Sequence, residues 1–123
     1  MKTIEIPNAS WKGFLDEFSR EHDGWFISVE VQDPEIGAQT EVKNRAFRGA
    51  TYERRPGDGV ITIMADDTSG NHLTHAVKHP SRIWFERTDE GADEALAIEA
   101  GATKTLVRFR WRVIPELVSP GVE

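Results

Sequence analysis

Cysteine is absent from this chain of 123 residues. Its absence excludes thiol catalysis, a disulfide framework and zinc sites built on thiolates. Long apolar runs are also missing, so no segment reaches the roughly 20 residues that a membrane-spanning helix needs. No apolar stretch follows Lys2, so a secretory signal peptide is not predicted. We expect a cytoplasmic protein without a membrane partner.

Positive charge is in deficit, because 15 lysines and arginines face 21 aspartates and glutamates, for a formal net charge of -6. A nucleic-acid binder needs basic side chains in surplus to neutralise phosphates, so the composition argues against that function. The length fits one domain whose core needs no disulfide or metal. We predict a single α+β domain over residues 1–115 and a flexible tail over residues 116–123.

The clearest element is an amphipathic helix near the N-terminus. Its apolar stripe has helical spacing and consists of Trp11, Phe14, Leu15 and Phe18. Asn8 or Ser10 can cap the start of this helix, and Gly24 can end it in left-handed backbone. One such stripe implies one sheet for the helix to cover.

From Trp25 onward apolar and polar residues alternate, which is the period of β-strands. The strand-like segments are residues 2–6, 25–32, 39–47, 60–65, 72–77, 82–88, 92–100 and 107–113. Segments 2–6 and 39–47 are predicted to be edge strands, Gly49 a bulge or a tight bend, and the very apolar segment 60–65 the middle strand. Alanines and glutamates in segment 92–100 would also suit a helix, but the glycine turn after it favours a hairpin.

This order of elements predicts an α+β fold that is mainly β. We expect the N-terminal amphipathic helix to pack on a curved antiparallel sheet or on a small open barrel of SH3-like or Sm-like type. The C-terminal hairpin, residues 95–110, is an addition to a minimal barrel. Both arrangements fit the sequence.

Three of the four histidines lie within the stretch from Val60 to Glu86. His72, His75 and His79 suit zinc or a similar ion, which needs about three nitrogen or oxygen ligands at one point. A regular strand opposes such convergence, since it directs His72 and His75 to opposite faces. The competing interpretation is a partly buried, pH-sensitive His75 that bonds a backbone carbonyl, with the other two at the surface.

A second candidate surface combines basic and aromatic side chains. Its members are Arg82, Trp84, Arg108, Arg110 and Arg112. Arginines in a row on one strand face can hold a carboxylate or a phosphate. They can equally form a solvated face that pairs with acids such as Glu86 and Glu99.

Recognised catalytic motifs are missing. The chain has no phosphate-binding glycine loop, dinucleotide fingerprint or nucleophile elbow. Asp66 to Asn71 contains several oxygen ligands without the spacing of a calcium loop, so an ordinary turn is expected there. We expect no cofactor, and the sequence disfavours an enzyme.

Three segments, in this order, resemble a small bacterial family. They are Phe14-Leu15-Asp16-Glu17-Phe18-Ser19-Arg20 with His22-Asp23-Gly24-Trp25, then His72-Leu73-x-His75-x-Val77 with Pro80 and Ile83, then Ala95-Leu96-Ala97-Ile98-Glu99 with Thr105-Leu106-Val107-Arg108-Phe109. Over residues 4–110 the chain is similar to the family catalogued as domain of unknown function number five-three-three-five. The resemblance implies a free-standing, single-domain bacterial protein and no particular activity.

The hypothesis that follows is a non-catalytic binding or protein-interaction module. Its contact residues would be Arg82, Trp84, Arg108 and Arg110, and its partner a protein or a second copy at an edge strand. One alternative is a small-ligand or metal site around His72, His75 and His79. Another is nucleic-acid binding by a small barrel, which the net charge disfavours.

Overall fold

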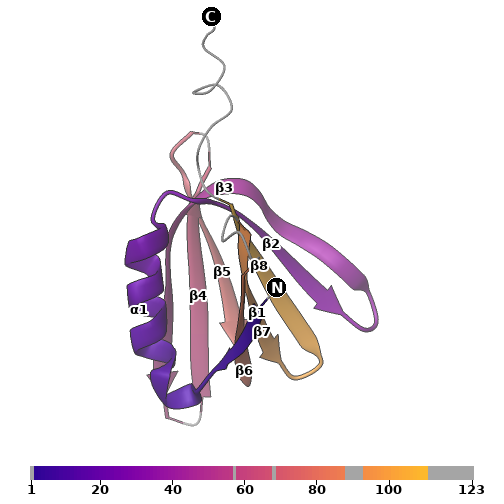
Figure 1. Cartoon of the computed structure of the whole chain (residues 1–123). Helices are drawn as coiled ribbons and strands as arrows, with labels where there is room; N and C mark the ends of the chain where they lie inside the picture. Colours follow the sequence, from indigo (N-terminus) through magenta and orange to yellow (C-terminus); the bar gives the residue numbers. More distant parts are fainter. Residues whose placement is uncertain (1, 57, 68, 88–92, 111–123) are drawn as a thin grey trace, which may run out of the picture.

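A computed structural model describes residues 2–56, 58–67, 69–87 and 93–110. These residues form one α-helix and one antiparallel sheet (Figure 1). The elements are β1 (Lys2–Ile6), a 3-10 turn (Asn8–Ser10), α1 (Trp11–His22), β2 (Phe26–Asp33), β3 (Gly37–Arg55), β4 (Asp58–Asp66), β5 (His72–Lys78), β6 (Arg82–Arg87), β7 (Asp93–Ala100) and β8 (Thr103–Arg110). The predicted tail, residues 116–123, and Arg112 lie outside the described residues.

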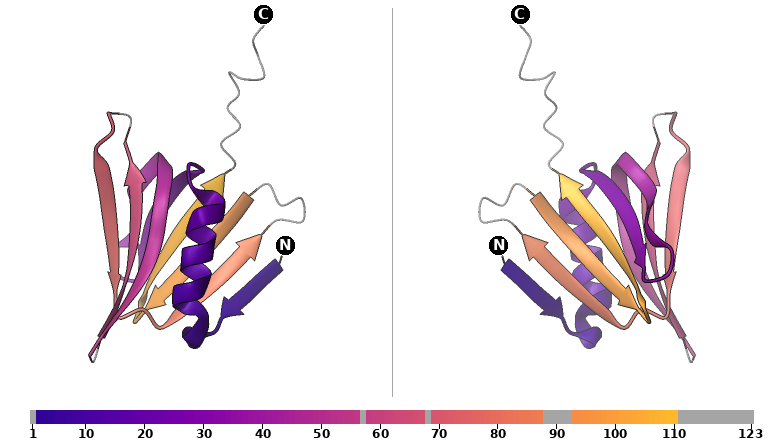
Figure 2. Two further views of the ribbon diagram at one scale, coloured as in Figure 1. Left: turned by 90° about the vertical axis from the view of Figure 1, so that its left-hand side faces the viewer. Right: turned by 90° about the vertical axis from the view of Figure 1, so that its right-hand side faces the viewer.

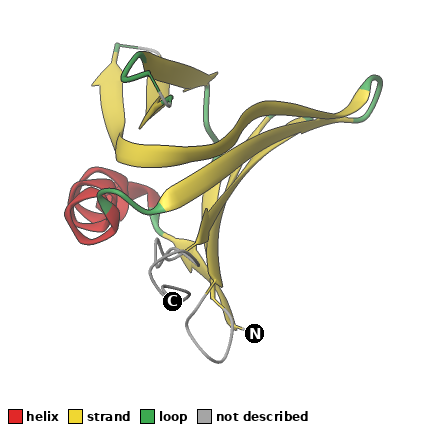
Figure 3. Ribbon diagram, turned by 90° about the horizontal axis from the view of Figure 1, so that it is seen from above, coloured by secondary structure: helices red, strands yellow, loops and turns green. Residues whose placement is uncertain are grey.

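All eight strands belong to a single sheet with the order β1-β6-β7-β8-β2-β3-β4-β5. The two halves of the sheet converge at one end and spread at the other, with β3, β4 and β5 on one side and β1, β6, β7 and β8 on the other (Figure 2). Seen from above, the sheet bends around the helix (Figure 3). The prediction of a mainly β fold with a helix on a curved antiparallel sheet is confirmed, and the sheet is open rather than closed.

Strand β3 has 19 residues and serves both halves of the sheet. Its first part pairs with β2 as far as Ala46, and its second part pairs with β4 from Ala46 to Arg55. The register shifts between Phe47 and Gly49, where a bulge lets the strand bend from one half to the other. The predicted bulge is confirmed. The segment predicted as a separate edge strand, residues 39–47, is the first part of this long strand, and as far as Arg45 its only described strand partner is β2, on one side.

Strand β4 is not the middle strand that its apolar sequence predicts. It lies between β3 and β5, one place from the edge, whereas β8 and β2 lie at the centre of the order. Its apolar residues Ile61, Ile63 and Ala65 are buried because one face of β4 packs into the core. Strands β1 and β7 form where segments 2–6 and 92–100 predict them, β1 at the edge of the sheet.

Helix α1 has the predicted apolar face, extended by a histidine. The buried residues of the helix are Trp11, Leu15, Phe18 and His22. The predicted side-chain cap is absent: Ser10 is the N-cap residue without a side-chain hydrogen bond, and Asn8 belongs to the 3-10 turn. Gly24 follows the helix with a φ of 89°, a conformation that glycine adopts without steric cost, as predicted for the helix end.

The helix covers the edge of β3 that lies beyond the end of β2. Phe47 N donates to Trp25 O at 2.7 Å, one step past the β2 ladder. Further along, Ala50 N donates to the Ser19 hydroxyl at 2.9 Å, and that hydroxyl lies 2.7 Å from Leu15 O and 3.0 Å from Ala50 O. The helix therefore satisfies backbone groups that a neighbouring strand would otherwise pair.

Aromatic rings join the helix to both halves of the sheet. The Phe18 ring lies 4.8 Å from that of Phe109, 5.7 Å from that of Phe85 and 6.3 Å from that of Phe47, all edge to face. Each such pair contributes about 0.5–1.5 kcal/mol beyond its buried area. Most of the buried apolar side chains form one contiguous cluster around these rings.

Candidate binding face and the histidines

The three histidines of the Val60–Glu86 stretch lie apart. On β5, His72 shares its exposed face with Thr74, whereas His75 is half-buried on the face of Val77. His72 Nδ1 lies 2.7 Å from Asp66 Oδ1 and its side chain is 82% exposed. Within the described ranges, no group of three or more histidine, aspartate and glutamate side chains could hold a metal ion.

His75 is half-buried on β5, and the described residues include no backbone carbonyl bonded to its ring. Burial lowers the pKa of His75 from its ordinary value, and the negative charge of Glu41 partly opposes that effect. The neutral imidazole is therefore favoured. Its cross-strand neighbour on β4 is the buried Ile63.

His79 lies at the junction between β5 and β6. Its Nδ1 is 2.8 Å from Asp58 Oδ1, and its side chain is 72% exposed. Its backbone φ is 57°, which is unusual for any residue other than glycine. Asp58 begins β4, so this ion pair links the β3–β4 turn to the β5–β6 junction.

The turn after β4 is organised by one carboxylate. Asp67 Oδ1 accepts from Ser69 N at 2.9 Å, from the Ser69 hydroxyl at 2.9 Å and from Asn71 N at 2.8 Å. The Ser69 hydroxyl and these backbone groups lower the pKa of Asp67, because they favour its charged form. These bonds are those of the ordinary turn that the sequence predicts.

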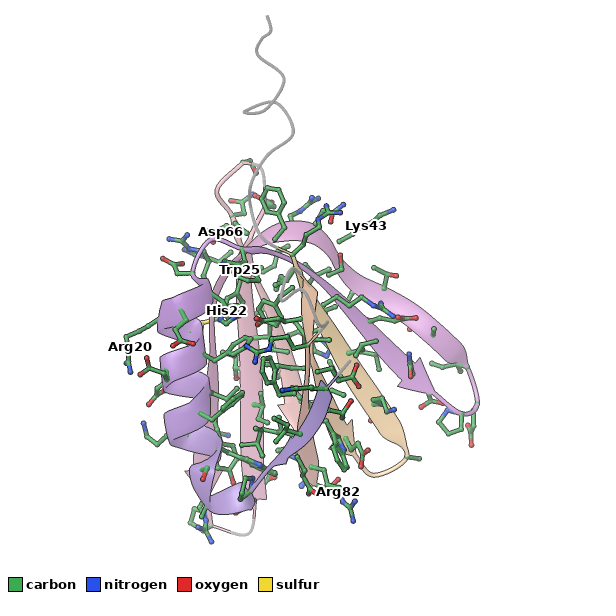
Figure 4. All side chains as sticks on the ribbon, viewed as in Figure 1. Arg20, His22, Trp25, Lys43, Asp66 and Arg82 are labelled. Atoms are coloured by element: carbon green, nitrogen blue, oxygen red, sulfur yellow. The ribbon has the colours of Figure 1, made fainter. Side chains whose placement is uncertain are left out.

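The fourth histidine, His22, is the deeply buried one, and the sequence interpretation gives it no role. Figure 4 shows His22 pointing from the end of α1 toward the sheet, whereas Arg20 points away from it. His22 Nε2 lies 2.6 Å from Glu94 Oε1, and the two side chains are only 8% and 10% exposed. The imidazole stacks on Phe18 with a centroid distance of 3.8 Å.

The protonation of His22 follows from its partners. His22 Nδ1 lies 2.9 Å from Phe18 O, which can only accept, so Nδ1 carries a proton. The contact between Nε2 and Glu94 then holds one further proton, on the ring or on the carboxyl group.

The helical spacing of His22 after Trp11, Leu15 and Phe18 could have revealed its burial. Its partner, 72 residues further along the chain, gives no local signal.

The predicted basic and aromatic residues do share one surface. The outward-facing residues of the central strands are Arg82, Trp84 and Glu86 on β6, Ala95, Ala97 and Glu99 on β7, Leu106, Arg108 and Arg110 on β8, and Phe26, Ser28 and Glu30 on β2. We call this surface the outer face, since α1 packs against the opposite face of these strands. No described element covers the outer face.

An apolar row crosses the middle of the outer face. Trp84 pairs with Ala97, and Ala97 pairs with Leu106 on the next strand. Ala97 is only 3% exposed although it is not part of the main core, because its larger neighbours shield it. Trp84 Nε1 donates to Glu99 Oε2 at 3.0 Å, which fixes the indole on this face.

A cavity of about 440 Å³ lies beside this row, where Ala95 and Ser28 provide little bulk. Arg108 and Arg110 line it, together with Glu86 and Phe26. Arg108 Nη1 is 3.1 Å from Glu30 Oε1, so one of the two arginines is already paired with an acid.

Asn44 lies at the rim of this cavity in left-handed backbone, with a φ of 52°. The distance from Arg110 Nη2 to Asn44 Oδ1 is 3.4 Å, and Asn44 N donates to the Ser28 hydroxyl at 3.2 Å. Asparagine tolerates this conformation better than most residues, and strained positions often lie at ligand clamps. Among the described side chains, the partner of Arg110 is therefore a neutral amide oxygen.

Acidic and basic side chains alternate on the outer face. Glu99 of β7 is opposite Arg82 of β6 on one side and Lys104 of β8 on the other. Arg108 of β8 is opposite Ala95 of β7 and Ser28 of β2, and it forms an ion pair with Glu30 of β2. This pattern differs from the continuous positive groove that binds a nucleic-acid backbone. The outer face suits a partner that offers both apolar and charged groups.

The fold and this surface define a class: an open, curved antiparallel sheet of eight strands, covered by one helix on one face and by no described element on the other. The sequence model of the Family of unknown function (DUF5335) matches residues 2–116, and the chain belongs to this family. An uncharacterized protein of Aquifex aeolicus (strain VF5) is 28% identical over 110 residues, which are 89% of this chain and 94% of that protein. No solved structure matches the chain.

The expected resemblance to this family is therefore confirmed over nearly the whole chain. Among the described residues, α1 is too short and too polar to cross a bilayer.

Proposed function

We propose that this protein is a non-catalytic interaction module that binds a protein partner through the outer face. The observation behind this proposal is the apolar row of Trp84, Ala97 and Leu106 beside a cavity lined by Arg108 and Arg110. Tryptophan and arginine are the side chains that contribute most to protein interfaces when a partner buries them. The opposite face of the same strands is filled by the core and is not free to bind.

The chemistry of the cavity specifies the partner. Three arginines line it, Arg87, Arg108 and Arg110, against two acids, Glu86 and Glu94, and Glu94 is already bonded to His22. Among the described side chains, Arg110 has an amide oxygen as its partner, so a carboxylate would replace a weak contact with a charge-assisted one. The partner is therefore a protein segment that places a carboxylate over Arg110 and an apolar side chain against Trp84.

Interface variants test this proposal. Trp84→Ala and Arg110→Glu change the outer face at two places, and Arg20→Glu makes the same change of charge on the exposed face of α1 as a matched control. Proteins captured from the native cell extract are identified, and the affinity of each is measured by calorimetry. We expect both outer-face variants to weaken the Kd at least tenfold, or about 1.4 kcal/mol, and the control to leave it unchanged.

Equal binding by wild type and both outer-face variants would contradict the proposal. Loss of binding in the Arg20 control would place the interface on the helix instead. Far-ultraviolet circular dichroism of each variant separates a lost contact from a lost fold.

A second candidate is self-association through β1. Among the described strands β1 pairs only with β6, and its Ile4 side chain is 54% exposed. If the β1 strands of two copies paired antiparallel with Ile4 opposite Ile4, these two side chains would be in contact. The unpaired backbone groups of both β1 strands would then bond each other. Sedimentation equilibrium is expected to show a dimer that Ile4→Lys abolishes, since two like charges would then lie opposite each other where the edges pair. A monomer at all concentrations rules this candidate out.

A further inference from the structure

A second hollow, of about 370 Å³, lies away from the outer-face cavity. It lies between the β3–β4 turn and the β5–β6 junction, at the lower end of the sheet in Figure 1. Its lining includes Tyr52, Arg54, Asp58, Gly59 and His79. The family description assigns no role to these residues, and the proposed protein interface does not use them.

His79 is held in an unfavourable backbone conformation at this hollow. Its φ is 57°, and the next residue is Pro80. A residue before proline is normally extended, so left-handed backbone is doubly unfavourable for a histidine here. His79 N donates to Gly59 O at 3.0 Å, which ties this strained residue to the start of β4. Strain of this kind persists where the surrounding structure enforces it, commonly at a ligand site.

The imidazole of His79 has a fixed direction. His79 Nδ1 lies 2.8 Å from Asp58 Oδ1, so Nε2 is on the side of the ring directed away from that carboxylate. His72 has the same kind of partner, with Nδ1 at 2.7 Å from Asp66 Oδ1, but it stands on a regular strand and lines neither of the two cavities. His72 therefore provides a matched control for His79.

The other polar groups of the hollow, Asn8, Tyr52, Arg54 and Arg55, all carry hydrogen-bond donors, and Asn8 and Tyr52 also carry acceptor oxygens. Arg55 Nη2 is 3.0 Å from Glu53 Oε1, whereas Arg54 makes no ion pair within the described ranges. The Tyr52 ring lies directly over Gly59, where an added Cβ would be 2.9 Å from both Cε1 and the phenol oxygen. Only glycine at residue 59 leaves room for the tyrosine hydroxyl at this place.

We propose that this hollow is a binding site for a phosphate monoester, held between the Arg54 guanidinium and Nε2 of His79. The guanidinium and phenol groups offer donors to the oxygens of one tetrahedral anion, and Nε2 of a neutral His79 ring, whose Nδ1 proton is directed at Asp58, accepts from the hydroxyl of a monoprotonated phosphate. The volume exceeds that of the phosphate alone and leaves space for a small organic group beside Pro80. The strained backbone of His79 keeps the imidazole at the rim of the hollow.

Nuclear magnetic resonance of the histidine side chains tests the site in the full-length protein. Inorganic phosphate, phenyl phosphate and acetate are added separately, with sodium chloride at matched ionic strength. We expect the ring signals of His79 to shift and saturate with both phosphates, while those of His72 follow the chloride control. Arg54→Gln is expected to weaken phosphate binding at least tenfold, and His72→Asn to leave it unchanged.

Shifts that do not saturate, or that are equal at His72 and His79, would overturn the proposal, because general screening of surface charge acts on both. Acetate binding as tightly as phosphate would overturn the assignment to the phosphate class.

A glycine variant separates binding from folding. Glycine adopts left-handed backbone freely, so His79→Gly is expected to unfold at a urea concentration no lower than wild type while it loses phosphate binding. In the control His72→Gly, the same change within a strand is expected to lower the unfolding midpoint and keep phosphate binding. Unchanged phosphate affinity in His79→Gly would show that the imidazole is not a ligand and would overturn the proposal.

Discussion

His22 and Glu94 form the most enclosed contact between two ionisable side chains among the described residues. Their side chains are 8% and 10% exposed, and the two residues lie 72 positions apart in the sequence. Water cannot replace either partner easily in this environment. Loss of one group therefore leaves the other buried without its partner, which costs more than the loss of both.

A double-mutant cycle measures this contact. We expect His22→Phe and Glu94→Leu each to lower the free energy of unfolding by about 2–5 kcal/mol. The double variant should lose less than the sum of the two, with a coupling energy of about 1–3 kcal/mol. Urea unfolding followed by circular dichroism gives the three values. Additive effects would mean that the two side chains do not interact in the folded protein.

His75 predicts a dependence of stability on pH. Burial lowers its pKa in the folded state below the ordinary value of 6.5, so between the two values the unfolded chain binds more protons. The free energy of unfolding therefore decreases as the pH falls through and below 6.5. Above that pH the residue is neutral in both states and makes no pH-dependent contribution.

Two measurements test the role of His75. An imidazole titration by nuclear magnetic resonance should give a midpoint below 6.5 for this residue. Replacing it in His75→Gln should make stability fall less steeply on acidification, whereas Thr74→Gln on the opposite face of β5 should retain the wild-type slope. A titration midpoint above the ordinary value would show that the attraction of Glu41 outweighs burial.

At the scale of elements, α1 substitutes for a strand along the second part of β3. Ser19 makes this possible, because its hydroxyl accepts from Ala50 N at 2.9 Å and lies 3.0 Å from Ala50 O. Ala50 is 2% exposed, so water does not reach these groups readily. The bulge at Gly49 brings this stretch of β3 against the helix.

Ser19→Ala tests this junction. We expect a loss of about 1–3 kcal/mol in the free energy of unfolding, because the buried amide of Ala50 loses its acceptor. The same amide should exchange with deuterium faster than its neighbours in β3. The control is Ser81→Ala, which removes an exposed hydroxyl that donates to Glu99 O and should cost less than about 0.5 kcal/mol. Equal losses in the two variants would contradict a special role for Ser19.

Local pattern was sufficient to predict the helix and most strands. The stripe from Trp11 to Phe18 has a helical period, and the alternation around Val107 and Phe109 has the period of a strand facing one core. The length of β3 was not predictable in this way. A bulge interrupts its alternation at Gly49, so the pattern resembles two short strands rather than one bent strand.

Pairing partners and strand order depend on contacts between distant residues. The apolar sequence of β4 indicates burial, but a strand next to the edge is equally buried when one of its faces packs into the core. The shared outward direction of Arg82 and Trp84 follows from alternation within one strand. The cavity beside Ala95 requires the register of four further strands, β7, β8, β2 and β3, which the sequence does not encode locally.

At the scale of the whole molecule, one core connects the helix to both halves of the sheet. The cluster contains Phe18 of α1, Ile61 of β4 and Ile98 of β7. Neither half has a second core of its own among the described residues. The outer face and the hollow at His79 are both supported by this common core, so a ligand at either site binds a single folded unit.

This arrangement predicts cooperative unfolding over the whole chain. Tryptophan fluorescence and far-ultraviolet circular dichroism should give the same urea midpoint, because Trp11 and Trp25 belong to the same core as the sheet. Phe18→Ala should lower both midpoints together, with a loss of about 3–5 kcal/mol, since it removes the ring that contacts Phe47, Phe85 and Phe109. Arg20→Ala, on the exposed face of the same helix, should leave both midpoints unchanged. Two separate transitions, only one of them sensitive to Phe18→Ala, would instead mean that the two halves of the sheet fold independently.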